Sequence, residues 1–216
     1  MLPYLLLIGT LRLIVLGCQS TFALTGVYLC PVGRHKLASC IGRASPHNVA
    51  MQYQLGIIGA GNMAEPIARG VLRAGLLRPE QVIAADPSPQ RRAVFEQLGI
   101  RTTQVNTEAL DADTILLSVK PQMMQTALEQ IAGAISPSSL IISIAAAITT
   151  RFIETHLGTG GKWRVIRTMP NTPMLVGAGI VGMSAGAHAT TADLAQARTL
   201  FESAAQVVEL PEDQLD

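Results

Sequence analysis

A glycine-rich element with the pattern G-x-G-x-x-A carries the clearest chemical signal in this chain; it consists of Gly59, Ala60, Gly61, Asn62, Met63 and Ala64. It directly follows the apolar residues 55–58 and opens an amphipathic stretch, which is the strand–turn–helix context of a dinucleotide-binding loop. Gly59 permits a tight turn, Gly61 lets a diphosphate approach the backbone, and Ala64 lets helix and strand pack closely. The N–H groups at the helix start would hold the diphosphate. The element therefore predicts a dinucleotide site, with an ordinary strand–helix turn as the alternative.

An acidic residue and two arginines bear on which dinucleotide is bound. Asp86 ends the second apolar run, residues 82–86, where an acid normally accepts hydrogen bonds from the adenosine ribose hydroxyls and favours NAD. Its charge would repel the 2′-phosphate of NADP, whereas Arg91 and Arg92 could neutralise that phosphate. The two arginines could equally belong to a solvated helix face. These residues leave the choice between NAD and NADP open.

Short apolar runs alternate with amphipathic stretches from residue 54 onward. The runs are nearly continuously apolar, as expected of parallel strands that are covered on both faces. The pattern predicts strands over 55–59, 82–86, 114–119, 140–145, 163–169 and 177–183. It predicts helices over 63–74, 90–98, 123–132, 149–156 and 191–205. This alternation is typical of an α/β fold with a doubly wound, Rossmann-like, mostly parallel sheet and helices on both faces.

The first fifty residues differ from the rest of the chain. They hold four Lys or Arg residues, no acidic residue, and all three cysteines of the protein, Cys18, Cys30 and Cys40. We expect residues 1–50 to lie outside the fold, either because translation starts at Met51 or because they form a membrane, export or transit segment. Residues 51–216 then form one dinucleotide-binding domain. Its lack of cysteine excludes a disulfide-built fold and favours the cytoplasm, and the net charge of +1 argues against nucleic-acid binding.

Two further segments have the composition of ligand-binding turns. One leaves the carboxyl end of a predicted strand, where open α/β sheets place ligands, and comprises Ser118, Val119, Lys120 and Pro121. The proline ends the strand, and the lysine either serves a phosphate or covers apolar surface with its stem. In the other segment, Asn171 stands between Pro170 and Pro173. This second segment is either a rigid loop that presents an amide or a structural kink.

Four segments, in order along the chain, carry a family resemblance. They are the strand and glycine element at 55–64, LSVKPQ at 117–122, ISIAAA at 142–147 and RTMPNTP, an R-x-M-P-N-x-P pattern, at 167–173. In these segments, residues 51–216 resemble the N-terminal portion of the pyrroline-5-carboxylate reductases. Beyond the glycine element and Asp86, the resemblance implies cofactor contacts by Asn106, Ser118, Val119, Lys120, Pro121, Ala145, Ala146 and Asn171.

The resemblance also implies an activity. Such a protein reduces 1-pyrroline-5-carboxylate to L-proline with a hydride from NAD(P)H, the last step of proline synthesis. The family favours NADPH, whereas Asp86 argues for NADH. No metal is implied, and no ligand-like spacing relates the histidines, His35, His47, His156 and His188.

In that family a helical second domain follows, supplies substrate contacts and forms the dimer. The sequence ends at Asp216, where that domain would begin. We therefore expect the catalytic residues, and any homodimer or higher oligomer, to depend on that domain, and this chain alone to turn over poorly. The alternatives are a non-catalytic dinucleotide-binding fragment and a different reductase with the same cofactor-binding half, such as a β-hydroxyacid dehydrogenase or a deazaflavin-dependent NADP reductase. The R-x-M-P-N-x-P pattern disfavours the second alternative.

Overall fold

The computed structural model describes residues 52–158, 160–176 and 178–215, so the predictions for residues 1–50 lie outside the described residues. The strands are β1 (Tyr53–Ile58), β2 (Val82–Ala85), β3 (Arg101–Thr103), β4 (Ala112–Leu117), β5 (Leu140–Ser143), β6 (Arg164–Pro170), β7 (Gly179–Ala185) and β8 (Ala205–Glu209). The α-helices are α1 (Ala64–Arg73), α2 (Pro89–Glu96), α3 (Met124–Ile131), α4 (Thr150–Leu157) and α5 (Thr191–Glu202). The 3-10 helices are η1 (Pro79–Gln81), η2 (Asn106–Leu110), η3 (Pro121–Met123), η4 (Thr172–Val176) and η5 (Glu212–Gln214). Within the described ranges, no helix has both the length and the apolar character needed to cross a membrane.

The strands form one sheet in the order β3-β2-β1-β4-β5-β6-β7-β8. Neighbouring strands are parallel from β3 to β6, β7 is antiparallel to β6, and β8 is parallel to β7. The predicted mostly parallel, doubly wound sheet is confirmed. Because β1 pairs with β2 on one side and β4 on the other, the strand order reverses at β1. Sheets of this kind bind ligands at such a switch point, outside the carboxyl ends of the strands.

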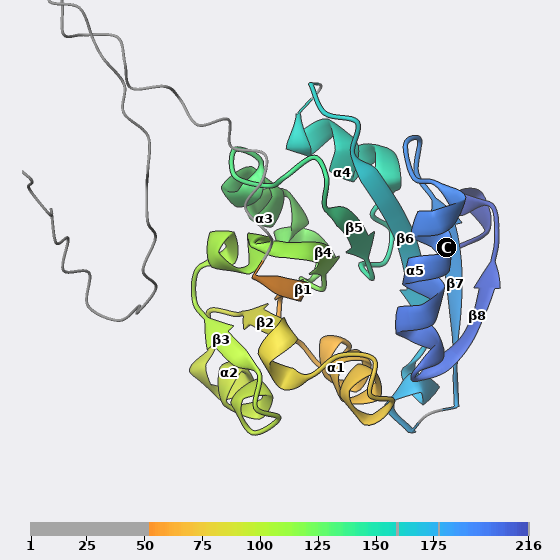
Figure 1. Cartoon of the computed structure of the whole chain (residues 1–216). Coiled ribbons are helices and arrows are strands. Elements are labelled where there is room, and N and C mark those ends of the chain that lie inside the picture. Colours follow the sequence, from red (N-terminus) through yellow and green to blue (C-terminus); the bar gives the residue numbers. More distant parts are fainter. Residues whose placement is uncertain (1–51, 159, 177, 216) are drawn as a thin grey trace, which may run out of the picture. The chain divides into compact units, whose positions relative to one another are not determined.

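Helices cover both faces of the sheet (Figure 1). Ile57 and Leu116 belong to the core beneath α1, α2 and α5, whereas Ile58 and Leu117 belong to the core beneath η2, α3 and α4. Successive side chains of a strand point to opposite faces, so a strand covered on both faces needs apolar residues at nearly every position. This requirement explains the unbroken apolar runs from which the central strands were predicted.

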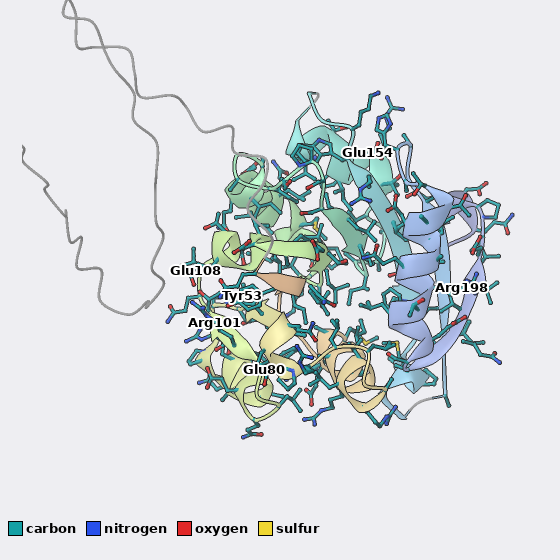
Figure 2. All side chains as sticks on the ribbon, in the orientation of Figure 1. Tyr53, Glu80, Arg101, Glu108, Glu154 and Arg198 are labelled. Atoms are coloured by element: carbon teal, nitrogen blue, oxygen red, sulfur yellow. The ribbon has the colours of Figure 1, made fainter. Side chains whose placement is uncertain are left out.

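The two edge strands were missed by the apolar pattern. The last helix ends at Glu202, rather than at residue 205, and Ala205 begins β8. Arg198 of α5 donates to the carbonyl oxygen of Val207 at 3.0 Å and to the carboxylate of Glu209 at 2.6 Å, which ties the helix to this strand (Figure 2). At the opposite edge, β3 has only three residues, none of them buried. Each edge strand pairs on one side only and is partly exposed, so neither needs a continuous apolar run.

Candidate dinucleotide site

The glycine loop, residues 59–63, connects β1 to α1 at the carboxyl edge of the sheet. Gly59 has a φ of +94°, and its N–H donates to the carbonyl oxygen of Ala85 at 2.8 Å. A Cβ atom on Gly59 would lie 2.8 Å from the carbonyl carbon and oxygen of Ser118. The turn therefore passes directly against the end of β4, with a backbone conformation that side chains disfavour. The fold itself requires glycine at this position.

Gly61 is different, because nothing in the described protein requires it. A Cβ atom there would make only ordinary contact, 3.7 Å from the carbonyl oxygen of Ser118. The N–H groups of Gly61, Asn62 and Met63 have no acceptor within the described part of the chain. In addition, Met63, the N-cap residue of α1, provides no side-chain hydrogen bond to the start of the helix, whereas the Ser88 side chain caps α2. Unpaired N–H groups at a helix start attract anions, so this loop fits a diphosphate.

Ser118 directly follows β4, and its backbone carbonyl group lies against Gly59 of the glycine loop. The hydroxyl oxygen of Ser118 is buried and has no hydrogen-bond partner among residues 52–158, 160–176 and 178–215. A buried polar atom without a partner destabilises a protein by about 1–3 kcal/mol, so such atoms are uncommon.

We therefore expect Ser118→Ala to leave the free energy of unfolding of the ligand-free protein unchanged, or to raise it by up to about 1 kcal/mol. The substitution removes an unpaired polar atom and leaves the backbone in place. Chemical denaturation of the wild-type and variant chains measures the difference. A loss of more than about 1 kcal/mol would contradict the expectation, because it would mean that the hydroxyl is paired in the ligand-free protein.

Asp86 directly follows β2 and turns its carboxylate toward the glycine loop. Its Oδ2 accepts the N–H of Ala60 at 2.8 Å, and its Oδ1 accepts the N–H of Ser88 at 2.8 Å. The carboxylate thus joins the end of β2 to the loop on one side and to the start of α2 on the other. Asp86 lies at the expected edge of the sheet, but both of its oxygens contact the protein's own backbone.

Arg91 and Glu65 hold the outer side of the glycine loop. Nε of Arg91 donates to the carbonyl oxygen of Ala60 at 2.6 Å, and its Nη2 donates to Glu65 at 3.1 Å. Burial would raise the pKa of Glu65, but hydrogen bonds and charge from Arg69 and Arg91 outweigh burial and lower this pKa. The stabilisation from ionised Glu65 is therefore complete above its ordinary pKa of 4.5 and is lost as the pH falls through the lower folded value.

The turns after β4 and β5 continue the same edge of the sheet. Val119 and Pro121 are half-buried and Lys120 is exposed in the turn after β4. Ala145 is buried and Ala146 is half-buried in the turn after β5. Because β4 pairs with β1 and β5 pairs with β4, these predicted site residues follow one another along the edge from the glycine loop.

The two predicted asparagines have partners within the protein. Nδ2 of Asn106 donates to Oε1 of Gln130 at 2.7 Å, which joins η2 to α3. Oδ1 of Asn171 accepts the N–H of Ile180 at 2.9 Å, which fixes β7 against the end of β6. Neither side chain contacts the glycine loop in the described structure. Both therefore have a structural role, and any cofactor contact by either of them stays a prediction.

Sequence reasoning missed two residues that support the glycine loop. Ser88 carries a local signal, because serine before proline is typical of a helix N-cap, and Ser88 does cap α2. Glu65 carries none, since an acid in the first turn of a helix is common for reasons of helix dipole alone. Its partner Arg91 lies 26 residues further along the chain, so only the fold brings the two together.

A comparison with known protein families gives a match over the part of the chain that contains the glycine loop. A family model described as "NADP oxidoreductase coenzyme F420-dependent" matches residues 54–147. Pyrroline-5-carboxylate reductase 3 of Rattus norvegicus is 35% identical over 164 residues, which cover 76% of this chain and 59% of the relative. The chain thus spans about three fifths of the length of the curated relatives that it matches. The family model ends before the R-x-M-P-N-x-P segment, so it does not distinguish among reductases that share the cofactor-binding half.

Solved structures show the same relationship. The pyrroline-5-carboxylate reductase from Coxiella burnetii has a TM-score of 0.70 and 31% identity, over 76% of this chain and 61% of that chain. The pyrroline carboxylate reductase of Plasmodium falciparum, solved with NADP bound, has a TM-score of 0.65 and 25% identity, over 77% of this chain and 60% of that chain. By sequence and by fold, about three quarters of this chain is therefore similar to about three fifths of the pyrroline-5-carboxylate reductases.

Proposed function

We propose that the chain binds NADPH or NADH at the carboxyl edge of β1, β2, β4 and β5. The contrast within the glycine loop carries this proposal. Packing and a positive φ require Gly59, whereas nothing in the described protein requires Gly61, which lies at the start of three unpaired N–H groups. A diphosphate is the ligand that this arrangement fits. The NADP bound to the Plasmodium falciparum relative supports the same conclusion.

Each part of the edge has a distinct role in the proposed site. The N–H groups of residues 61–63 bind the diphosphate, and the backbone of Ser118 lies against the glycine loop. Val119, Lys120 and Pro121 after β4, with Ala145 and Ala146 after β5, line the space toward the nicotinamide. Asn106 and Asn171 lie at the margins of the site, on the connections that follow β3 and β6.

We further propose that the protein is an NAD(P)H-dependent reductase that acts on a C=N bond, with 1-pyrroline-5-carboxylate as substrate and L-proline as product. The names of the relatives support this substrate. When bound, the reduced nicotinamide supplies the hydride, while the chain binds it, orients it and fixes its distance from the substrate. No described residue is assigned a catalytic role. We place this activity in the cytoplasm, because residues 51–216 hold no cysteine.

Titration of NADPH and NADH into the full chain, followed by the fluorescence of the nicotinamide, tests the proposed site. We expect saturable binding of at least one of the two. Gly61→Ala should weaken that binding about tenfold or more, because its methyl group lies where the diphosphate approaches the backbone. The melting temperature should not change, because the Cβ atom meets no close neighbour.

Gly133→Ala is the matched control, since Gly133 lies just after α3 and a Cβ atom there has no neighbour within 4 Å. It should change neither binding nor melting temperature. If neither cofactor gives a saturable signal, the proposed function is wrong. Consumption of NADPH or NADH that depends on added 1-pyrroline-5-carboxylate supports the reductase, whereas binding without such turnover favours the non-catalytic alternative.

A further inference from the structure

The described sheet has two edge strands, β3 and β8, which are protected in different ways. β3 has three residues, and a strand this short offers little to a pairing partner. β8 has five residues and contains neither Lys nor Pro, the residues with which exposed edge strands usually resist pairing. We propose that Arg198 closes the β8 edge, and that without Arg198 this strand pairs with β8 of a second copy of the chain.

The backbone groups of β8 alternate between the two sides of the strand. The N–H of Leu210, just after the strand, donates to the carbonyl oxygen of Met183 of β7 at 2.9 Å. Because alternate residues of a strand turn their backbone groups to the same side, residues 206 and 208 face β7, and residues 205, 207 and 209 face outward. Within the described residues, no strand pairs with that outer side. Its backbone groups are those that a further strand would bind.

Arg198 of α5 covers the middle of this outer side (Figure 2). Its Nη1 donates to the carbonyl oxygen of Val207 at 3.0 Å, and its Nη2 donates to the carboxylate of Glu209 at 2.6 Å. The carboxylate of Glu202, 3.5 Å from Nη1, holds the guanidinium from the helix side. A pairing strand would need the Val207 carbonyl oxygen for one of its own N–H groups. Arg198 therefore has to give up its contacts before a second strand can bind.

The charge pattern of β8 favours an antiparallel pair of two copies. A two-fold axis at Val207 would place Ala205 opposite Glu209 and Gln206 opposite Val208, so that no like charges face each other. A parallel pair in register would instead place the two Glu209 carboxylates side by side, which is unfavourable. The strand is thus complementary to itself in one orientation.

An exposed apolar surface beside the edge supports the same partner. Val208 is 44% exposed and Ile180 of β7 is 49% exposed. Ile180 pairs in register with Gln206, so Ile180 and Val208 lie on the same face of the sheet. In the antiparallel pair, Val208 of one copy would be the diagonal neighbour of Val208 of the other. The two apolar surfaces would then join, and their burial would favour association.

Sedimentation equilibrium of the full chain, as wild type and as Arg198→Ala, tests the proposal at about 5–200 μM. We expect the weight-average mass of the variant to rise up to about twofold relative to the wild type at equal concentration. Hydrogen exchange in residues 205–209 of the variant should slow at the higher concentration, because a partner strand would bind their outward N–H groups. An unchanged mass, or a higher mass with unchanged exchange in this segment, would overturn the proposal.

A second substitution shows whether association occurs through β8. Val208→Lys, added to Arg198→Ala, should return the mass to the wild-type value, because the two lysines would be diagonal neighbours of like charge. If loss of Arg198 caused association by partly unfolding the chain, Val208→Lys would not reverse it. A rise in mass that persists in the double variant would therefore contradict pairing at this edge.

Arg78→Ala is the matched control for charge. The Arg78 side chain is 78% exposed and precedes β2, which lies beside the opposite edge strand. It should change neither the mass nor the exchange of residues 205–209, and an equal rise in both single variants would mean that loss of charge alone causes association. Because the proposed dinucleotide site lies at β1, β2, β4 and β5, Arg198→Ala should bind the cofactor as the wild type does. Failure of either proposal leaves the other intact.

Discussion

Replacing Gly59 with alanine is expected to lower the free energy of unfolding by about 2–4 kcal/mol. Two effects act together at this position. The φ of +94° disfavours any side chain, and the new Cβ atom would lie 2.8 Å from the carbonyl group of Ser118. The neighbour is the backbone of the residue that directly follows β4, a central strand, so it cannot move aside as a flexible side chain would. Denaturant unfolding of the ligand-free chain measures this loss.

Gly75→Ala separates the two effects. Gly75 also has a positive φ, +66°, but a Cβ atom there would meet nothing within 4 Å. The free energy of unfolding of this variant should therefore fall by only about 1 kcal/mol, which is the contribution of the positive φ without a steric clash. If Gly59→Ala lowered the free energy of unfolding no more than Gly75→Ala does, the close approach between the glycine loop and the end of β4 would not exist in solution. Gly59→Ala should also abolish cofactor binding, because it displaces the loop from the edge of the sheet.

Removal of the Glu212 carboxylate is expected to have the second large effect on stability. Its Oε1 accepts the N–H of Thr150 at 2.7 Å, and its Oε2 accepts the Thr150 hydroxyl at 3.0 Å. It also pairs at 3.8 Å with Arg167 of β6, whose side chain is only 1% exposed. One carboxylate thus joins η5, the start of α4 and a buried cation of the R-x-M-P-N-x-P segment.

Glu212→Ala should therefore lower the free energy of unfolding by about 2–3 kcal/mol, because it removes the acceptor for a buried N–H and weakens the compensation of a buried charge. For a chain of this size that corresponds to a melting temperature lower by about 4–10 °C. Glu212→Gln keeps an acceptor for the Thr150 N–H, so it should lower the free energy of unfolding by about half as much as Glu212→Ala.

Glu209→Ala is the matched control, because it removes a carboxylate that pairs with Arg198 at the surface. Exposed ion pairs contribute little, so it should change stability by less than about 1 kcal/mol. If Glu209→Ala and Glu212→Ala lowered the free energy of unfolding equally, the buried contacts of Glu212 with Thr150 and Arg167 would not explain the loss of stability.

Local patterns of the sequence were sufficient to predict the central sheet and the position of the glycine loop. A strand covered on both faces must be apolar at successive positions, so β1, β2, β4 and β5 can be recognised from a few consecutive residues. The G-x-G-x-x-A pattern likewise needs only its two flanking elements to indicate a turn at the carboxyl edge. The edge strands β3 and β8 lack this local signal, since each is held by one neighbour and by side-chain contacts such as those of Arg198.

The sequence by itself determined that residues 59–63 form a loop suited to a dinucleotide, because that property depends on neighbouring residues and on the absence of side chains. Only the tertiary structure decided which glycine the fold requires, since a Cβ atom on Gly59 would lie 2.8 Å from the Ser118 carbonyl group, whereas one on Gly61 would lie 3.7 Å from it and make only ordinary contact. It also decided that the Asp86 carboxylate turns to the backbone of the loop, and that Glu212 reaches Thr150 across 62 residues of sequence. Hydrogen bonds between distant segments depend on how strands and helices pack in three dimensions, and no periodicity in the chain records that packing.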